Sequence, residues 1–376
     1  MSGTIPGPPM APRGDEPARR PGLALALGGG GARGLAHIGV LQALELEGIA
    51  PGFVAGTSVG GLVGALHAGG LRSKDLVQIA RSFRFPRWFL PGGLLAWGKI
   101  FPSAAEVLPP TFQDLGTPLA ITAVDIEEGI QVVLHTGSLP PAVRATCALP
   151  GVLPPERIGG RWLVDGGVTN ALPVDVAWMA DPDLVIAVRV GGPATRRMPQ
   201  LAWGMTRMLS RLGRIVPNPA TAKISFKILA RAAEIVLEHQ TALSAAMTDP
   251  EVQIEPVLGA MGLRDFDRLD YAVAAGRRAA EAVLPALTAL LASPRGKSLE
   301  ASDPVSRHFD PVCTMAMHPM RARATATHEG ILYYFCSANC RDRFLRSPAR
   351  YLGSTKLAFR PQHAPPAQGT IGSRDP

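Results

Sequence analysis

The pentapeptide GTSVG (56–60) places Ser58 between Gly56 and Gly60, directly after the apolar run FVA. G-x-S-x-G between a strand and a helix is typical of a nucleophile elbow, a turn tight enough to lift the serine hydroxyl clear of the sheet. The N-terminal end of the following helix would stabilise negative charge there. Because such a pentapeptide also occurs by chance, a serine nucleophile further requires a base and an oxyanion hole.

A run of glycines at residues 28–31, the glycine loop, lies between a predicted strand and a predicted helix. Free backbone N–H groups at the start of a helix bind anions. The spacing of Gly29, Gly31 and Gly34 also matches the G-x-G-x-x-G pattern of dinucleotide-binding folds, which need an acidic residue at the end of the second strand. The second strand here ends in VAGTSVGG, without a carboxylate, so an oxyanion hole is the better interpretation. Its predicted donors are the N–H groups of Gly29, Gly30 and Gly31.

The predicted base is Asp165, in the segment WLVDGGVTN (162–170). A predicted strand ends at this aspartate, and Gly166 and Gly167 leave its carboxylate uncrowded. A carboxylate at the same edge of the sheet as the elbow can accept a hydrogen bond from the serine hydroxyl. The alternative is that Asp165 simply begins a turn, the commonest role of Asp-Gly.

The histidines of the chain are weaker candidates for the base. His37 and His67 lie on predicted helices just after the glycine loop and the elbow, where packing or capping roles fit them better. The first histidine beyond Asp165 is His239, on a predicted basic helix.

Strand and helix patterns alternate between residues 22 and 190, which favours a mostly parallel sheet with helices on both faces. Strands are expected at Leu23–Leu27, Phe53–Thr57, Leu119–Val124, Gln131–His135, Trp162–Val164, Leu184–Val190 and Val252–Pro256. Helices are expected at Arg33–Glu47, Gly60–Ala68, Lys74–Arg81, Pro141–Ala148 and Pro173–Met179, with two more in 198–247 and an Ala-rich helix at Phe266–Leu291.

The composition limits the class of protein. A chain of 376 residues with 18% charged residues is long and apolar enough for a packed core. The net charge of +8 favours acidic partners, although an Arg-rich composition without a specific partner also fits. The uncharged stretch Gly48–Leu71 is long enough to span a bilayer, but its glycines and Pro51 favour a strand followed by a buried helix.

These motifs together resemble the patatin-like phospholipase family, in particular its compact bacterial members. The resemblance runs from about Leu23 to Val190 and includes GGGGARG, GTSVG, DGG and the segment RATCALPGVLPP (144–155). It implies a three-layer α/β/α fold, a Ser58–Asp165 dyad without a catalytic histidine, and hydrolysis of lipid acyl esters. It also implies that Arg33 helps to position the glycine loop around the oxyanion hole. One departure is Leu27, which precedes the loop where many members carry aspartate.

A second resemblance covers residues 309–352, where FDPVCTMAM, YYFCSANCRDRF and SPARYL are similar to the small YHS, or TRASH-like, cysteine module. Thiolates at the spacing of Cys313, Cys336 and Cys340 suit Zn(II) or Cu(I). The helix expected at Cys336 and Cys340 would turn both thiols to one side. The alternative is that the cysteines pack a small core. One histidine would complete a tetrahedral site, and the candidates are His308, His318 and His328.

The segment RSFRFPRWFLPGGLLAWGKIF (81–101) alternates cations with Phe, Trp and Leu. Such a stretch fits the interface of an anionic membrane, where Trp is favoured, and it fits ordinary core and loop packing equally well.

The expected organisation has six parts. They are a disordered arm at 1–21, a catalytic domain at 22–192, its helical extension at 193–292, a linker at 293–304, the cysteine module at 305–354 and a disordered tail at 355–376.

The sequence therefore predicts a cytoplasmic serine hydrolase acting on lipid acyl esters, with no cofactor for hydrolysis and with peripheral membrane contact. The apolar run after Arg19 and Arg20 is too short for a secretion signal. Nucleic acid is not an expected partner. The alternatives are a soluble carboxylesterase without phospholipid preference and a metal-responsive regulatory protein whose cysteine module is the functional site.

Overall fold

The computed structural model describes residues 22–83, 101–180, 182–191, 240, 250–292, 308–313, 316–317, 322–329, 331–335 and 337–352. The chain divides into two compact units, Met1–Val305 and Ser306–Pro376. Each unit is described by itself.

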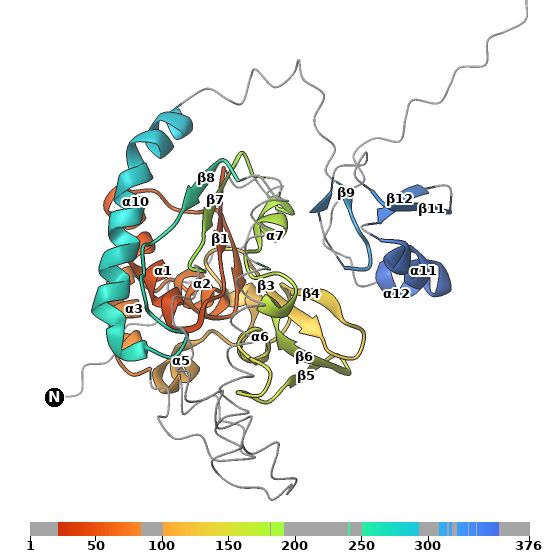
Figure 1. Cartoon of the computed structure of the whole chain (residues 1–376), viewed down its shortest axis with the longest axis horizontal. Coiled ribbons are helices and arrows are strands. Elements are labelled where there is room, and N and C mark those ends of the chain that lie inside the picture. The colour runs from red at the N-terminus through yellow and green to blue at the C-terminus, as the bar shows by residue number, and fades with distance from the viewer. Residues whose placement is uncertain are drawn as a thin grey trace, which may run out of the picture. The chain divides into compact units, whose positions relative to one another are not determined.

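An eight-stranded mixed sheet forms the centre of the first unit (Figure 1). The strands are β1 (Leu23–Leu27), β2 (Phe53–Thr57), β3 (Leu119–Asp125), β4 (Ile130–Leu134), β5 (Glu156–Ile158), β6 (Arg161–Asp165), β7 (Leu184–Val188) and β8 (Val252–Ile254). Their order is β5-β6-β3-β2-β1-β7-β8, and β4 also pairs with β3. Strands β3, β2, β1, β7 and β8 run parallel to one another. Strands β4 and β6 each pair antiparallel with β3, and β5 pairs antiparallel with β6.

Helices cover both faces of this sheet, so the unit has the predicted three-layer α/β/α fold. The helices are α1 (Ala36–Leu46), α2 (Val59–Ala68), α3 (Ser73–Ala80), α5 (Pro102–Val107), α6 (Leu139–Thr146), α7 (Val174–Trp178) and α10 (Leu269–Ala292). In Figure 1, α1, α2 and α10 lie on one side of β1 and β7, and α7 lies on the other.

The central strand β1 is apolar throughout because both of its faces are covered. All five residues of LALAL are buried, with Leu25 paired to Val54 on one side and to Ile186 on the other. Continuous apolar runs are typical of parallel strands between two helical layers. The glycine loop and the elbow follow β1 and β2, which are neighbours, so this edge of the sheet brings the two motifs together.

Helices α1 and α10 cross in close contact because each has a glycine at the crossing. A Cβ atom at Gly39 would overlap the carbonyl oxygen of Val273, and one at Gly276 would overlap that of Ala36. Since α1 begins just after the glycine loop, this crossing holds the helix that follows the loop.

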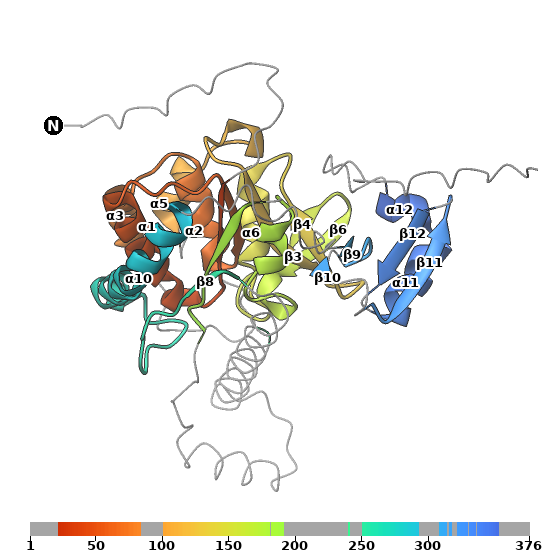
Figure 2. The ribbon, with the colours of Figure 1, turned by 90° about the horizontal axis from the view of Figure 1, so that it is seen from above.

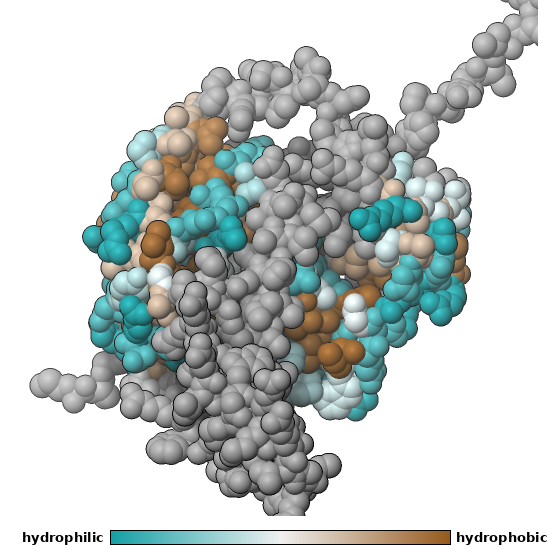
Figure 3. Space-filling view, in the orientation of Figure 1, coloured by the Kyte–Doolittle hydropathy of each residue, from teal (hydrophilic) through white to brown (hydrophobic). Residues whose placement is uncertain are grey.

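On the outer surface, apolar residues are visible along the C-terminal part of α10, where Leu291 is exposed (Figure 3).

Replacing Gly276 by alanine should lower the free energy of unfolding by about 1–3 kcal/mol, because the added methyl group forces the two helices apart. The exposed substitution Arg278→Ala on the same helix should change it by less than about 0.5 kcal/mol. Denaturant unfolding of both variants measures the difference. Equal stability of the two variants would contradict the tight crossing.

Some elements differ from the sequence-based expectation. Strand β5 and helix α5 were not predicted, and β7 ends at Val188, two residues before the predicted end. The predicted helices in 198–247 and most of the aromatic stretch 81–101 lie outside the described residues. Among the residues that the structure describes, no helix is both long and apolar enough to cross a membrane.

Among its described residues, the second unit forms two two-stranded sheets and two helices, which Figure 2 labels. Its elements are β9 (His308–Phe309), β10 (Ala316–Met317), β11 (Ala324–His328), β12 (Ile331–Phe335), α11 (Ala338–Arg346) and α12 (Pro348–Leu352). Phe335 and Phe344 are fully buried, with ring centroids 5.3 Å apart. The core of this unit is therefore small and aromatic.

Candidate functional site

Ser58 lies at the turn between β2 and α2 in a backbone conformation that non-glycine residues rarely adopt. Its φ is 55° and its ψ is −130°. Gly56 and Gly60 permit the turn, because a Cβ at Gly56 would lie 2.5 Å from Cα of Gly61 and one at Gly60 would lie 2.6 Å from the oxygen of Gly28. Backbone strain of this kind is concentrated at functional sites. The turn has the geometry of a nucleophile elbow.

The hydroxyl of Ser58 donates a hydrogen bond to Oδ2 of Asp165, at 2.6 Å. Asp165 ends β6, and its other oxygen accepts the N–H of Gly167 at 2.8 Å. Gly166 is needed at this turn because a Cβ there would overlap the hydroxyl of Thr122. Ser58 and Asp165 are 8% and 2% exposed, so the pair is shielded from most of the solvent. A serine and a carboxylate in this arrangement can act as nucleophile and base.

The buried environment of Asp165 raises the pKa of its carboxyl group. Burial raises the pKa of this carboxyl from 3.8 to about 6, and the hydrogen bonds from Ser58 and Gly167 act in the opposite direction. A base with a pKa near 6 is ionised at neutral pH and is still basic enough to accept a proton from an attacking hydroxyl.

A reaction that uses Asp165 as its base should therefore slow as the pH falls through about 6. A carboxylate accepts a proton only when it is ionised, so kcat/KM for such a reaction should fall about tenfold per pH unit below that value and should be level from about pH 7 to 8. Initial rates with a soluble ester between pH 4.5 and 8.5 measure this profile. A rate that stays level down to pH 4.5 would show that Asp165 is not the base.

Thr146 bonds the backbone of Ser58 and was not predicted. Its Oγ1 accepts the N–H of Ser58 at 2.8 Å. The segment that carries it is held by a bidentate ion pair between Arg144 on α6 and Glu156 on β5, at 2.9 and 2.7 Å. The segment RATCALPGVLPP, which is identified from sequence only by its resemblance, thus contributes a direct contact to the elbow.

A buried polar network supports the other side of the elbow. Thr57 donates to the carbonyl of Asn170 at 3.0 Å and pairs with the hydroxyl of Thr122 at 2.6 Å. The amide of Asn170 donates to Asp175 at 2.6 Å. Burial raises the pKa of Asp175, and the hydrogen bond from Asn170 partly offsets this rise. The network ties the turn after Asp165 to the residue before Ser58.

The glycine loop lies against Ser58, because a Cβ atom on Gly29 would lie 3.2 Å from Cβ of Ser58. The N–H of Gly28 donates to the carbonyl of Val188 at 3.1 Å, and that of Gly29 donates to Ala171 at 2.7 Å. The prediction of Gly29 as an oxyanion donor is corrected on this point, because its N–H is already bonded. Within the described part of the chain, the N–H groups of Gly30 and Gly31 have no hydrogen-bond partner.

Arg33 bonds both the glycine loop and a distant segment of the chain. Its Nε donates to the carbonyl of Met261 at 2.7 Å, and its backbone N–H donates to Gly30 at 3.1 Å. Gly31 has a φ of +53°, and a Cβ there would lie 2.5 Å from the oxygen of Leu263. Gly34 packs against Val59 with similarly little space. The Nε of Arg33 is thus bonded to the backbone of Met261, and the role of Arg33 in positioning the loop stays a prediction.

The histidines that were weighed as bases do not contact Ser58 or Asp165 among the described hydrogen bonds. His37 on α1 bonds the carbonyl of Gly28 at 2.7 Å and is fully buried. His67 lies near the end of α2 and bonds the backbone of Leu71. His239 lies outside the described residues.

In the second unit, one carboxylate and two thiols come together. The ligand atoms of Asp310, Cys313 and Cys340 all lie within 4.8 Å of one another. Asp310 is fully buried and also accepts the N–H groups of Val312 and Cys313 at 2.9 and 3.4 Å. Asp310 was not among the predicted ligands, although it is the aspartate of the DPVC segment.

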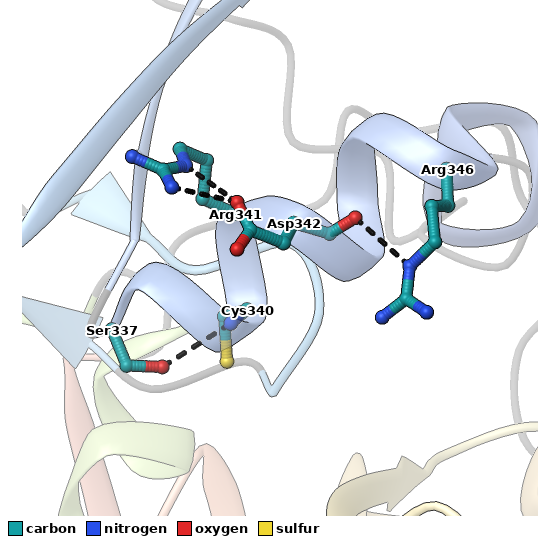
Figure 4. Close-up of polar contacts among 5 residues, drawn as sticks. All are labelled: Ser337, Cys340, Arg341, Asp342 and Arg346. Atoms are coloured by element: carbon teal, nitrogen blue, oxygen red, sulfur yellow. Dashed lines mark hydrogen bonds and ion pairs between the residues drawn. The ribbon is translucent and has the colours of Figure 1, made fainter.

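The other predicted ligands are not part of this group of three or lie outside the described residues. Ser337 caps α11 and accepts the N–H of Cys340 at 3.2 Å, so the helix begins at Ala338 (Figure 4). The expectation that Cys336 lies on this helix is therefore wrong, and its own position lies outside the described residues, as does that of His318. The ring of His328 packs edge-on against Phe344, with centroids 5.7 Å apart. The side chain of His308 is not described.

Comparison with known families finds one matching model in each unit. Residues 25–178 match the patatin-like phospholipase model, and residues 308–355 match the YHS domain model. The chain thus carries a patatin-like phospholipase domain followed by a YHS domain, as predicted.

Several curated relatives are similar to part of this chain. An uncharacterized NTE family protein of Mycobacterium tuberculosis is 35% identical over 179 residues, which are 46% of this chain and 50% of the relative. Another from the same organism is 30% identical over 292 residues, 70% of this chain and 46% of the relative. Patatin-like phospholipase domain-containing protein 6 of Mus musculus is 33% identical over 196 residues, 45% of this chain and 13% of the relative. The chain spans about half the length of the two mycobacterial relatives.

Among solved structures, VipD from Legionella pneumophila is similar to this chain with a TM-score of 0.39 and 15% sequence identity. The similarity covers 70% of this chain and 66% of the VipD chain.

Proposed function

We propose that the first unit is a serine hydrolase that cleaves acyl esters of lipids, with Ser58 as nucleophile and Asp165 as base. The observation that carries the proposal is the 2.6 Å hydrogen bond between these side chains, made at a strained elbow beside the glycine loop. The match of residues 25–178 to the patatin-like phospholipase model supports lipid esters as the substrate class.

The proposed reaction has two halves. Oγ of Ser58 attacks the ester carbonyl carbon and transfers its proton to Asp165, while the carbonyl oxygen gains negative charge that the N–H groups of Gly30 and Gly31 stabilise. The tetrahedral intermediate collapses, and the leaving alkoxide takes the proton from Asp165. Water then attacks the acyl-enzyme, with Asp165 accepting its proton, and the second collapse releases the fatty acid and returns the proton to Ser58.

A substrate panel tests this function. Purified protein is assayed on p-nitrophenyl esters of increasing chain length and on phospholipid vesicles, with released fatty acid measured by mass spectrometry and Ser58→Ala as the blank. Fatty acid release from phospholipid supports the proposal. Turnover of short soluble esters alone would favour the soluble carboxylesterase instead, and no Ser58-dependent turnover on any ester would overturn both.

The membrane contact predicted for 81–101 stays a prediction, because residues 84–100 lie outside the described residues.

We also propose that the YHS domain binds a metal ion through Asp310, Cys313 and Cys340. Two thiolates and one carboxylate are a donor set that suits Zn(II), whereas the oxygen ligand is less suited to Cu(I). The proximity of the three ligand atoms favours this role over simple packing of the cysteines.

The full chain should retain about one Zn(II) after dialysis, and Cys313→Ser combined with Cys340→Ser should remove it. Cys147→Ser, a buried cysteine of the first unit, is the matched control and should keep the metal. Elemental analysis gives the stoichiometry. Equal zinc content in the double variant and the wild type would exclude this site.

A further inference from the structure

His37 bonds the glycine loop, and the proposed mechanism gives this residue no role. Its Nε2 lies 2.7 Å from the carbonyl oxygen of Gly28, and its side chain is fully buried. A carbonyl oxygen only accepts hydrogen bonds, so Nε2 carries the proton and donates it. Burial lowers the pKa of His37 to about 4, while the bond to Gly28 acts in the opposite direction, so the ring is neutral at neutral pH.

The peptide unit between Gly28 and Gly29 is held at both ends. Its carbonyl is bonded by His37, and its N–H is bonded by Ala171 at 2.7 Å. Glycine residues have no side chain to restrict the backbone, so without such bonds a run of four glycines would sample many orientations. The orientation of this peptide unit determines where the next units, with the N–H groups of Gly30 and Gly31, can lie.

We propose that His37 is a positioning residue of the oxyanion site, which holds the carbonyl of Gly28 so that the N–H groups of Gly30 and Gly31 are preorganised for the oxyanion. This inference rests on the proposed hydrolase function. An oxyanion donor contributes about 10²–10³ in rate only when it is already in position as the charge develops, so loss of His37 should affect the transition state more than substrate binding.

The test compares two substitutions of His37 in the full chain whose side chains are of similar length. His37→Gln keeps an N–H donor near the position of Nε2, whereas His37→Met lacks one. We expect His37→Met to lower kcat by about 10- to 100-fold with KM within about threefold, and His37→Gln to recover most of this loss. His37→Asn, whose shorter amide does not reach Gly28, should behave like His37→Met and replaces it if His37→Met does not fold.

A transition-state analogue separates positioning from a general effect on the fold. A trifluoromethyl ketone forms a tetrahedral adduct with the nucleophile, so its affinity should fall in parallel with kcat/KM across these variants. His67→Met is the control, because it removes another largely buried histidine that bonds a backbone group, about 14 Å along α2 from Ser58. This control should keep the wild-type kcat and inhibitor affinity.

Wild-type kcat in both His37→Met and His37→Asn would overturn the inference, as would a His37→Gln variant that folds but is as slow as His37→Met. In either case Ser58-dependent hydrolysis by the wild type would leave the proposed function intact. If the wild type hydrolyses no ester, the proposed function fails first and the inference falls with it.

Discussion

Ser58→Ala and Asp165→Asn should each reduce ester hydrolysis by at least about 10³-fold, and the double variant should be no slower than the slower single variant. Nucleophile and base act as one unit, so removal of either leaves only the contribution of substrate binding and the oxyanion hole. Initial rates with one soluble ester, measured at pH 8 where Asp165 is ionised, give the comparison. Circular dichroism and thermal melting verify that the variants are folded.

A second serine–carboxylate pair in the same unit provides the control. The hydroxyl of Ser73 donates to Glu45 at 2.7 Å, much as that of Ser58 donates to Asp165. Ser73 lies at the start of α3, without a strained turn and without the glycine loop beside it. Ser73→Ala should keep the rate within about twofold of wild type. A loss in Ser73→Ala as large as that in Ser58→Ala would show that the assay reports folding and not chemistry.

Gly60→Ala should strongly reduce activity and lower stability together. The added methyl group would overlap the carbonyl oxygen of Leu27 and lie 2.6 Å from that of Gly28, and both of these are backbone atoms of the strand and loop that carry the oxyanion site. The elbow must open to make room, which displaces Ser58 from Asp165. We expect a loss of at least about 100-fold in kcat/KM and of about 1–3 kcal/mol in the free energy of unfolding.

Gly64→Ala, one turn later on α2, is the matched substitution. A Cβ there meets only side chains, the nearest of them Cγ1 of Val54 at 3.0 Å, and these can adjust. It should cost less stability than Gly60→Ala and leave the rate near that of the wild type. If both variants were equally active, the close approach at Gly60 would not be what shapes the elbow.

The central strands could be predicted from the sequence because they are buried on both faces. β1 and β2 have the predicted bounds. β1 is a continuous apolar run between Gly22 and Gly28, which has few other structures available. β5 was missed because it is only three residues long, has two charged residues and lies at the edge of the sheet, where Glu156–Ile158 pairs with β6.

The candidate dyad could be predicted because each member lies in a local motif, whereas its supporting contacts could not. Thr146 and Ala171 contact the elbow and the glycine loop from segments 88 and 142 residues further along the chain than Ser58 and Gly29. No local pattern shows that the N–H of Gly29 is already bonded to Ala171. The start of α11 was missed because Ser337, and not a residue before Cys336, is the N-cap.

Labelling with a fluorophosphonate tests most directly whether Ser58 is an activated nucleophile. The probe forms a covalent bond only with a serine whose hydroxyl is deprotonated as it attacks, and peptide mass spectrometry identifies the residue that carries the adduct. We predict about one adduct per chain, located on Ser58, absent in Ser58→Ala and strongly slowed in Asp165→Asn. An adduct on Ser73 or another serine, or ester hydrolysis that continues without any adduct on Ser58, would contradict the proposed site.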